Sequence, residues 1–277
     1  MILRLPRERT LSLERVPLAM GILNITPDSF SDGGVHFDAS RAIESGLKMI
    51  EDGAAIVDVG GESTRPGAAP ISSSDEIARV LPVIEGIRAK SDVAISIDTM
   101  KADVARAALD AGADIVNDVT ALRHDPHMRE LVAERDVPVI LMHMRGDPRT
   151  MQTMAKYDDV VWDVYRELRG FVDEAKHANV NQILIDPGIG FAKELEHNVA
   201  LLARCRELAP IAPFVIGASR KKFVGILTGR DAGPDRVAGS LAAVAAAFRG
   251  GASIVRVHDV RETTDFLKVL SAIDELV

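Results

Sequence analysis

Cysteine is nearly absent from this sequence, because Cys205 is the only one among 277 residues. A single cysteine excludes an internal disulfide framework and is typical of proteins that fold in a reducing compartment. Cys205 lies in a helical pattern, so we expect it to have a structural role. The cysteine content therefore predicts a cytoplasmic protein.

Long apolar runs and excess positive charge are also missing. No apolar run approaches the roughly 18 residues that a membrane-spanning helix needs, and the start of the sequence, MILRLPRERTLSLERVP, lacks the apolar core of a signal peptide. The formal net charge is −8, so general attraction to nucleic acid or to an anionic membrane is not expected. An anionic ligand would have to meet local groups of Arg and Lys.

A repeated pattern is what the sequence does contain. Residues 183–191, ILIDPGIGF, are a short apolar run that ends in a carboxylate and a glycine-rich turn, and a helical pattern follows. The same plan recurs at residues 55–59, 93–97, 114–116, 137–142, 214–216 and 253–257. This alternation predicts parallel βα units. In such units the functional side chains follow the carboxyl ends of the strands.

The number of repeats predicts the fold class. With one more apolar run at residues 18–25, the pattern gives eight strands with helices between them. The length of 277 residues is near the usual size of a single barrel of this kind. We therefore predict an α/β fold, a (β/α)8 TIM barrel that forms one domain over residues 1–277. Residues 2–17 read as two extended pieces, and we expect a hairpin that closes the barrel bottom.

Three predictions concern individual helices. Ser73 and Glu76 match the capping-box spacing at the start of the second helix. Residues 196–208 read as one helix. In the last helix, four apolar residues share one face and are expected to point inward: Phe266, Val269, Leu270 and Ile273.

Four polar residues follow the ends of predicted strands: Asp98, Asn117, Asp186 and Lys221. Two carboxylates, a carboxamide and an ammonium at one barrel mouth can bind a flat, nitrogen-rich heterocycle, because they accept from ring N–H groups and donate to ring carbonyls. Alternatives remain open for the single residues. Asp98 could cap the next helix, and Asp186 could only form a turn.

A second group of candidates joins the last predicted strand to the first. Arg256 and His258 are two residues apart, so they point to the same side of that strand. Asn24 ends the first strand, and its carbonyl could bind a hard cation such as Mg2+. Because the last strands of a barrel often hold a phosphate, the group predicts a site for a polyanion and a metal. The alternative is that His258 packs in the wall and Arg256 pairs with Asp259.

Loop residues supply further candidates. Arg65 forms the charged tip of the loop at 63–67, although it could be an ordinary solvated arginine. Phe30 and Phe191 are candidate apolar lids, although Phe191 could equally lie in the core. Arg220 and Lys222 flank Lys221, and we expect at least one of the two to be only a surface or ion-pair residue.

Eight motifs, taken in order, resemble dihydropteroate synthase. They are GILNITPDSFSDGG at 21–34, DVGGESTRPGA at 58–68, SIDT at 96–99, VND at 116–118, MHMRGDPRTMQ at 142–152, IDPGIGF at 185–191, ASRKKFVG at 218–225 and RVHDV at 256–260. The resemblance implies a homodimeric TIM barrel of folate biosynthesis. That family joins 6-hydroxymethyl-7,8-dihydropterin pyrophosphate to p-aminobenzoate, with Mg2+, and releases pyrophosphate and 7,8-dihydropteroate.

The resemblance also implies roles for single residues. The pterin would be held by Asp98, Asn117, Asp186, Lys221, Met142 and Gly217. The p-aminobenzoate pocket would be framed by Thr64, Arg65, Pro66, Phe191, Ser219 and Phe30. Pyrophosphate would be bound by Asn24, Arg256 and His258, with Asn24 also at the Mg2+. The catalytic residues would be Lys221, Arg256, His258 and Asp32, and Asp32 would belong with Phe30 to a lid loop.

Two positions depart from the common pattern of that family, and three rival functions stay open. Lys222 stands where many members have serine, which could alter the contact to the p-aminobenzoate carboxylate and to sulfonamides that mimic it, and Ala192 stands where glycine is common. The rivals are a methyltetrahydrofolate-dependent methyltransferase, a non-catalytic pterin-binding homologue, and a Schiff-base aldolase that uses Lys221 as its nucleophile.

Overall fold

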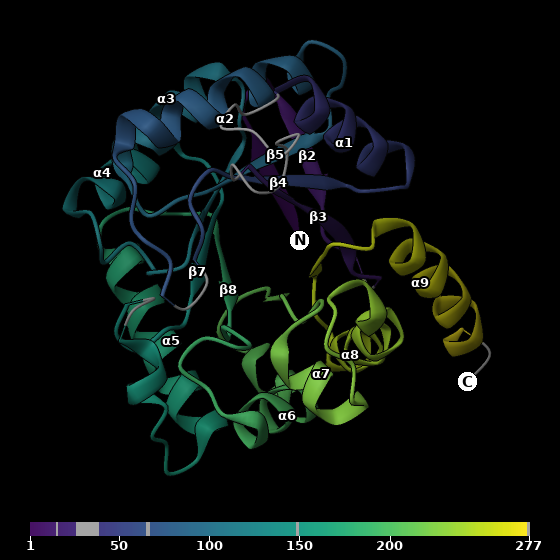
Figure 1. The fold of residues 1–277 in the computed structure, drawn as a ribbon. Helices are drawn as coiled ribbons and strands as arrows, with labels where there is room; N and C mark the ends of the chain where they lie inside the picture. The colour runs from purple at the N-terminus through teal and green to yellow at the C-terminus, as the bar shows by residue number, and fades with distance from the viewer. Residues whose placement is uncertain (15, 26–38, 65–66, 148–149, 276–277) are drawn as a thin grey trace.

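The structure is a computed structural model that describes residues 1–14, 16–25, 39–64, 67–147 and 150–275. In these residues, eight parallel strands form a barrel inside a ring of helices (Figure 1). The strands are β3 (Leu18–Asn24), β4 (Ile56–Gly60), β5 (Ala94–Asp98), β6 (Ile115–Asp118), β7 (Val139–Met142), β8 (Ile183–Asp186), β9 (Val215–Ile216) and β10 (Ile254–Val257). The predicted (β/α)8 fold is confirmed.

The strands pair in the order β8-β7-β6-β5-β4-β3-β10-β9, and a single bridge between Ile185 and Phe214 closes the ring. The backbone N–H of Ile185 donates to the carbonyl of Pro213 at 3.0 Å across the same gap. The seventh barrel strand is shorter than the apolar run predicted at residues 214–216, because Phe214 forms only this isolated bridge next to β9.

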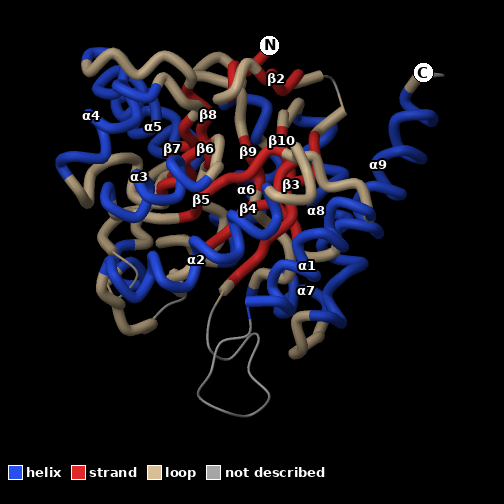
Figure 2. The backbone as a smooth tube through the Cα atoms, turned by 90° about the horizontal axis from the view of Figure 1, so that it is seen from above, coloured by secondary structure: helices blue, strands red, loops and turns tan. Residues whose placement is uncertain are grey.

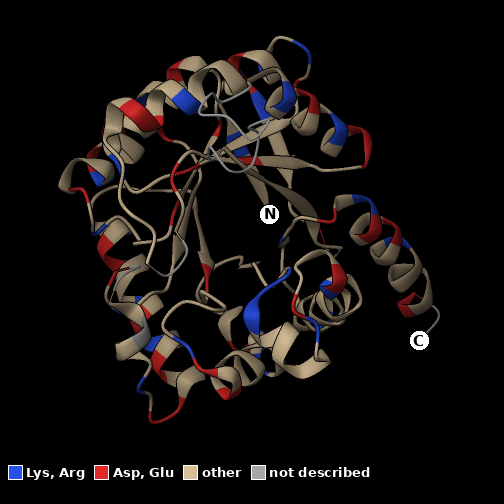
Figure 3. Cartoon of the chain, in the orientation of Figure 1, with Lys and Arg blue, Asp and Glu red and all other residues tan. Residues whose placement is uncertain are grey.

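Nine α-helices occur in the described residues and cover the outside of the barrel. They are α1 (Ala39–Glu51), α2 (Ser73–Arg88), α3 (Ala102–Ala111), α4 (Pro126–Arg135), α5 (Val160–His177), α6 (Leu195–Ala203), α7 (Lys222–Thr228), α8 (Val237–Gly250) and α9 (Val260–Asp274). Figure 3 shows Lys and Arg interspersed with Asp and Glu along these outer helices. No helix in the part of the chain that the structure describes is long and apolar enough to cross a membrane.

Two predictions at helix ends are wrong. The N-cap of α2 is Ser72, whose hydroxyl accepts from the N–H of Asp75 at 3.1 Å, and Glu76 is instead buried. The capping motif is therefore displaced by one residue. The predicted helix at 196–208 is also interrupted, because α6 ends at Ala203 and a separate 3-10 turn follows at Cys205–Leu208.

The face of α9 that packs inward also differs from the predicted one. Leu270 is buried as expected, but Val269 is 62% exposed and Ile273 is 55% exposed. The buried residues of this helix are Val260, Thr263, Leu267 and Leu270. A stripe that starts at Val260 follows the spacing of an amphipathic helix equally well, and the position of the strand end before α9 selects it.

The N-terminal hairpin closes the bottom of the barrel, as predicted. Strand β1 (Ile2–Leu5) pairs antiparallel with β2 (Arg9–Ser12), and in Figure 2 the hairpin lies at the top end of the molecule. Leu3, Leu5 and Leu13 pack against one inward-facing side chain from each barrel strand. This bottom ring consists of Met20, Ile56, Ala94, Ile115, Ile140, Leu184, Val215 and Ile254.

The position of the site relative to the bottom ring follows from the alternation of side chains along each strand. Successive side chains of a strand alternate between its two faces, so the residue two positions later points into the barrel again. These positions form a second ring: Ile22, Asp58, Ser96, Asn117, Met142, Asp186, Gly217 and Arg256. The bottom ring is apolar, whereas the second ring carries charge, so the barrel interior becomes polar toward the carboxyl ends of its strands.

Candidate active site

Arg256 bridges the mouth of the barrel. Its Nε donates to Asp58 Oδ2 at 2.6 Å, and its Nη2 donates to Asp98 Oδ2 at 2.7 Å. Asp58 is completely buried and also accepts from Asn117 Nδ2 at 3.2 Å. The alternative that Arg256 pairs with Asp259 is therefore wrong, because Asp259 accepts from Arg220 instead. We call the group Asp58, Asp98, Asn117, Asp186, Lys221 and Arg256 the cup.

Strand register aligns one side of the cup. Asn24, Gly60, Asp98 and Asn117 are successive Cα partners across the four neighbouring strands β3 to β6. A Cβ on Gly60 would lie 3.4 Å from Asp98 Cβ and 3.7 Å from Asn24 Oδ1. The glycine therefore leaves space between Asn24 and Asp98 at the row where the strands end.

Asp186 completes the opposite side of the cup. Its Oδ1 accepts from the N–H of Gly188 at 2.7 Å, so the alternative of a turn-forming aspartate holds for this oxygen. Its Oδ2 lies near Gly217, where a Cβ would come within 3.6 Å of it and within 3.8 Å of Arg256 Cβ. Met142 is the Cα partner of Asp186. The structure thus places Asp186, Gly217 and Met142 together, as predicted.

Lys221 reaches the cup from the start of α7. Its Nζ lies 4.2 Å from the centroid of the Phe191 ring, which is the geometry of a cation–π contact. Gly190 lies against the lysine stem, because a Cβ there would come 3.1 Å from Lys221 Cδ. Burial lowers the pKa of Lys221 to about 8, with a further decrease from the charge of Arg256. Lys221 therefore keeps its charge at neutral pH in a largely enclosed position.

The cup holds three carboxylates and two cations. Burial raises the pKa of Asp98 to about 7, a shift that Arg256 opposes and the charge of Asp58 supports. Burial also raises the pKa of Asp186. Asp98 Oδ1 is buried and has no hydrogen-bond partner among the described residues. A flat ligand with N–H donors would supply that missing partner.

Ser219 and His258 are joined beside the cup. The hydroxyl of Ser219 lies 3.1 Å from His258 Nδ1 and accepts from the backbone N–H of His258 at 3.2 Å. Burial lowers the pKa of His258 to about 4, and the charges of Arg220 and Arg256 add to the decrease. At neutral pH, His258 therefore offers a hydrogen bond and no charge to an anion.

A hollow borders His258 between α1 and the start of α9. Among its lining residues are Arg41, Lys48 and Arg261, together with Glu44 and Asp52. His258 thus faces an open, charged hollow and is only partly buried. The alternative of a histidine packed inside the wall does not describe this side chain.

The predicted Mg2+ site depends on Asn24. Within residues 1–14, 16–25, 39–64, 67–147 and 150–275, no group of three or more His, Cys, Asp or Glu could hold a metal ion. Asn24 supplies one carboxamide oxygen at the end of β3. Because Mg2+ keeps several waters and often binds through one or two protein oxygens plus substrate phosphates, Asn24 fits an Mg2+ that arrives with a diphosphate.

Several predicted loop residues lie outside the described part of the chain: Phe30, Asp32, Arg65 and Pro66. Thr64 is described and half-buried. The base of its loop is fixed by Lys101, whose Nζ donates to the Ile71 carbonyl at 2.8 Å and to Glu76 Oε2 at 2.7 Å, and also pairs with Glu62. This clamp was not predicted from the sequence.

The comparisons with known proteins agree with this geometry. The model of the pterin binding enzyme family matches residues 20–258. The chain is 46% identical over 260 residues to the dihydropteroate synthase of Escherichia coli, which covers 92% of this chain and 91% of that protein. The dihydropteroate synthase of Xanthomonas albilineans with 4-aminobenzoic acid has a TM-score of 0.92 at 46% identity, covering 99% of this chain and 98% of the other. The same enzyme in complex with 7,8-dihydropteroate has a TM-score of 0.90 at 43% identity, covering 99% of both chains.

This chain belongs to the dihydropteroate synthase family. The family that its eight motifs predicted is therefore confirmed. The structure brings together the residues that the resemblance to dihydropteroate synthase assigned to the pterin, and it adds Asp58, which was not singled out. A signal for Asp58 was present, because Asp58 lies two positions after Ile56 in an inward-facing alternation.

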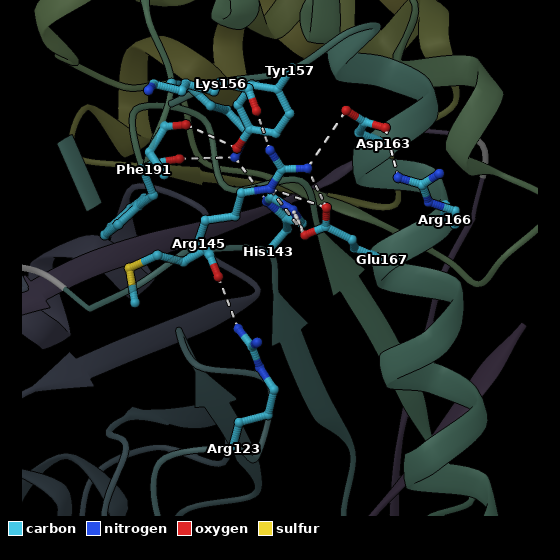
Figure 4. Close-up of polar contacts among 12 residues, drawn as sticks. Arg123, His143, Arg145, Lys156, Tyr157, Asp163, Arg166, Glu167 and Phe191 are labelled. Atoms are coloured by element: carbon cyan, nitrogen blue, oxygen red, sulfur yellow. Dashed lines mark hydrogen bonds and ion pairs between the residues drawn. The ribbon is translucent and has the colours of Figure 1, made fainter. Parts of the chain in front are cut away.

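A second polar network was not predicted either, and it lies to one side of Phe191 (Figure 4). It joins His143, Arg145 and Glu167 to the buried Lys193. His143 and Arg145 belong to the MHMRGDPRTMQ motif, which was a signal, but their partners lie on other elements and follow only from the fold.

Proposed function

We propose that the cup is the active site of a dihydropteroate synthase, in which 6-hydroxymethyl-7,8-dihydropterin pyrophosphate and p-aminobenzoate give 7,8-dihydropteroate and pyrophosphate. The observation that supports this proposal most is the buried cup, in which Asp98 Oδ1 has no hydrogen-bond partner among the described residues. The chain that carries this cup is 46% identical to a dihydropteroate synthase. Both the pterin ring and the diphosphate then have complementary groups within one barrel mouth.

The pterin end is assigned to the inner part of the cup. Asp98 and Asp186 accept from ring N–H and amino groups, whereas Asn117 and Lys221 donate to ring nitrogens or carbonyl oxygen. Met142 and Gly217 lie between these groups and provide flat apolar surface. The buried setting strengthens each hydrogen bond, since the local dielectric constant is lower than that of water.

The diphosphate end is assigned to the rim formed by Asn24, Arg256 and His258. Arg256 carries the charge, and His258 donates a hydrogen bond from its ring. Mg2+ bound to the diphosphate would use Asn24 as a protein ligand and would neutralise charge that develops on the leaving group. In the structure Arg256 is already neutralised by Asp58 and Asp98, so a ligand must share or replace these contacts.

The p-aminobenzoate end is assigned to Phe191 and Ser219, with Thr64, Arg65, Pro66 and Phe30 from the loops. Lys221 belongs to the cup and also contacts the Phe191 ring, so it lies between this end and the pterin end. Lys222, where many family members have serine, is exposed at the first position of α7. Its ammonium would therefore meet the carboxylate of p-aminobenzoate only at the edge of the pocket.

The chemistry is displacement of pyrophosphate from a CH2 group on an electron-rich ring. The ring delocalises positive charge, so the bond to the leaving group can break before the bond to the amine forms. The protein must neutralise the leaving group, hold the pterin in one orientation, and exclude water from the cation. The aniline nitrogen is already nucleophilic, and the proton that it loses after the C–N bond forms can pass to the departing pyrophosphate, so we assign no strong general base. Asp32, whose loop lies outside the described residues, is assigned to the covering of the site.

Two further expectations remain proposals. A homodimer is proposed with a contact face on α7 and α8, because α7 exposes Ile226 and Leu227 by 55% and 61% beside the Ala-rich α8. Sedimentation velocity would test it, and a monomer at micromolar concentration would contradict it.

A cytoplasmic location is proposed from the single cysteine and is tested by fractionation of the source cells.

The deciding experiment is an assay of pyrophosphate release with and without p-aminobenzoate. The proposal expects release only with both substrates and formation of one 7,8-dihydropteroate per pyrophosphate. Tight pterin binding without release would indicate the non-catalytic homologue. Borohydride trapping of a substrate on Lys221 would indicate the aldolase. Methyl transfer from methyltetrahydrofolate would indicate the methyltransferase.

A further inference from the structure

A buried lysine next to the cup has no part in the mechanism above. Lys193 is 6% exposed, and its Nζ donates to the carbonyl of Phe191 at 2.9 Å. The same Nζ lies 3.0 Å from Nδ1 of His143. Burial of an ammonium group is unfavourable unless its N–H groups are bonded. A methionine would fill similar space without this cost. The lysine therefore matters here through its two hydrogen bonds, which hold its Nζ in one position.

The contact to His143 continues to the outer side of the barrel. His143 is completely buried, and its Nε2 lies 3.0 Å from Glu167 Oε2. A neutral imidazole with its hydrogen on Nε2 donates to Glu167 and accepts from Lys193, which satisfies both ring nitrogens. Burial and the charge of Lys193 lower the pKa of His143 to about 4, which keeps the ring neutral.

Glu167 itself is held in place by Arg145. The guanidinium of Arg145 donates from Nε to Glu167 Oε1 at 3.1 Å and lies 4.0 Å from the centroid of the Tyr157 ring. Figure 4 shows the labelled side chains of His143, Arg145 and Glu167 converging to one side of Phe191. The order of contacts is therefore Arg145, Glu167, His143, Lys193 and the Phe191 carbonyl, and each group orients the next one.

The loop that carries Phe191 needs such support. Ala192 has φ 50°, in the left-handed region that is unfavourable for residues other than glycine. The loop is fixed before Phe191 by Gly190, whose N–H donates to Asn198 Oδ1 at 2.6 Å, and after it by Tyr157, whose hydroxyl donates to the Ala192 carbonyl at 2.9 Å. Lys193 binds the carbonyl between these two points and so determines the direction of that peptide group.

The anchored peptide group follows directly after the Cα of Phe191, so the contact from Lys193 helps to hold this residue and its ring in place. The ring is 4.2 Å from Lys221 Nζ on one side. It also packs against an apolar cluster that consists of Val119, Met142, Met144, Met151 and Ala192. Loss of the anchor on the Phe191 carbonyl would give this segment more freedom and would loosen the contact between the ring and Lys221, at the end of the site that we assign to p-aminobenzoate.

We propose that Lys193 is a positioning residue for the p-aminobenzoate end of the site: held by His143 and Glu167, it fixes the Phe191 peptide and thereby the ring that packs on Lys221. The inference rests on the proposed function, because it takes Phe191 as a wall of the p-aminobenzoate pocket. It concerns a residue that contacts neither substrate in this assignment.

The main test is Lys193→Met, which removes the amino group with both of its hydrogen bonds and keeps the length of the side chain. We expect the KM for p-aminobenzoate to rise about tenfold, the effect of losing one well-placed hydrogen bond. The KM for the pterin pyrophosphate should change less than threefold, because Asp98, Asn117 and Asp186 stay in place. A role in folding alone would lower the melting temperature and would change the two KM values by the same factor or not at all. That result would overturn the proposal.

A matched pair at His143 provides a second test if Lys193→Met does not fold. In His143→Asn, the side-chain oxygen can take the place of Nδ1 as the acceptor for Lys193, whereas His143→Leu offers no acceptor. The proposal expects a large rise in the KM for p-aminobenzoate in His143→Leu and a smaller one in His143→Asn. Equal values in the two variants would contradict it.

Assays of the wild-type enzyme distinguish a failure of the proposed function from a failure of the proposed role of Lys193. Absence of pyrophosphate release in wild type would overturn the proposed function and, with it, this inference. Normal release in wild type, with KM values for the two substrates that rise equally in the variants, would overturn only the role of Lys193.

Discussion

Arg256 Nη2 donates to Asp98 Oδ2 at 2.7 Å, although 158 positions separate the two residues in the sequence. Arg256 lies on β10 and Asp98 ends β5, and two further strands, β3 and β4, stand between them in the barrel wall. The guanidinium therefore spans the mouth and connects the groups assigned to the diphosphate with those assigned to the pterin. A substrate that enters the cup must interact with this ion pair.

Replacement of Arg256 by alanine should slow turnover strongly. Loss of one donor to the leaving group costs about 2–4 kcal/mol of transition-state stabilisation, which is roughly 30- to 1,000-fold in kcat/KM. Steady-state kinetics of pyrophosphate release measures the effect. Arg204→Ala is the matched control, because Arg204 forms exposed pairs with Asp159 and Glu207 on the outer surface. Turnover of Arg256→Ala within threefold of wild type would reject the role.

Asp186→Asn should weaken pterin binding and leave the turn at Gly188 intact. The amide keeps one oxygen that can accept from the Gly188 N–H, but it presents an NH2 donor where the carboxylate accepts from the pterin. A mismatched buried donor costs about 1–3 kcal/mol. Isothermal titration calorimetry with the pterin substrate measures the change. An unchanged affinity would show that Asp186 serves only the turn.

Pterin affinity should rise with pH between 5.5 and 7.5. Burial raises the pKa of Asp98 to about 7, so the carboxyl is mostly protonated at the lower end and becomes a full acceptor as pH increases. Lys221, with a pKa of about 8, stays largely charged in this window, and His258, with a pKa of about 4, stays neutral. Because only the ionised carboxylate acts as a full acceptor, the expected gain is roughly 25-fold.

Calorimetry at several pH values, on wild type and on Asp98→Asn, checks this pH dependence. The variant has no carboxyl at position 98, so its pterin affinity should be lower and nearly constant across the window. A wild-type affinity that does not vary between pH 5.5 and 7.5 would contradict the assignment of Asp98 as an ionised acceptor.

Stability should depend on a buried carboxylate at the bottom of the barrel. Asp114 is completely buried, pairs with Arg7, Arg9 and Arg88, and accepts from the N–H of Ile95 at 2.9 Å. It thereby ties the N-terminal hairpin to the barrel. Asp114→Ala leaves these cations without their partner and should lower the free energy of unfolding by about 3–5 kcal/mol.

Urea unfolding measured by circular dichroism gives this free energy. Asp173→Ala is the control, because Asp173 forms an i, i+4 pair with Arg169 and both side chains are about half exposed. Such a surface pair contributes about 0–1 kcal/mol. Equal losses in the two variants would show that the ion pairs of buried Asp114 add no more stability than a surface pair.

Much of the cup could be predicted from the sequence because strand ends can be read locally. Asp98, Asn117 and Asp186 each follow a short apolar run, and the barrel brings such ends to one face. The pairings inside the cup could not be predicted in this way. Arg256 and Asp58 are 198 positions apart, and nothing in either local sequence indicates the partner.

The errors at helices have a similar origin. Ser72, Ser73 and Ser74 are consecutive, so the sequence contains three candidate caps, and only the path of the chain selects Ser72. In α9 two apolar stripes overlap, and contact with the barrel determines that Leu270 is buried and Val269 is not. Local patterns predict that an element exists, whereas tertiary contacts determine its ends and its buried face.

The central claim is that one cup at the carboxyl ends of the strands binds the pterin. A crystal structure of the protein with the pterin pyrophosphate tests it most directly. The account predicts the pterin ring within hydrogen-bond distance of Asp98, Asn117 and Asp186, with the diphosphate directed toward Asn24 and His258. A pterin bound elsewhere on the molecule, with the Arg256 to Asp98 contact undisturbed and the cup empty, would contradict it.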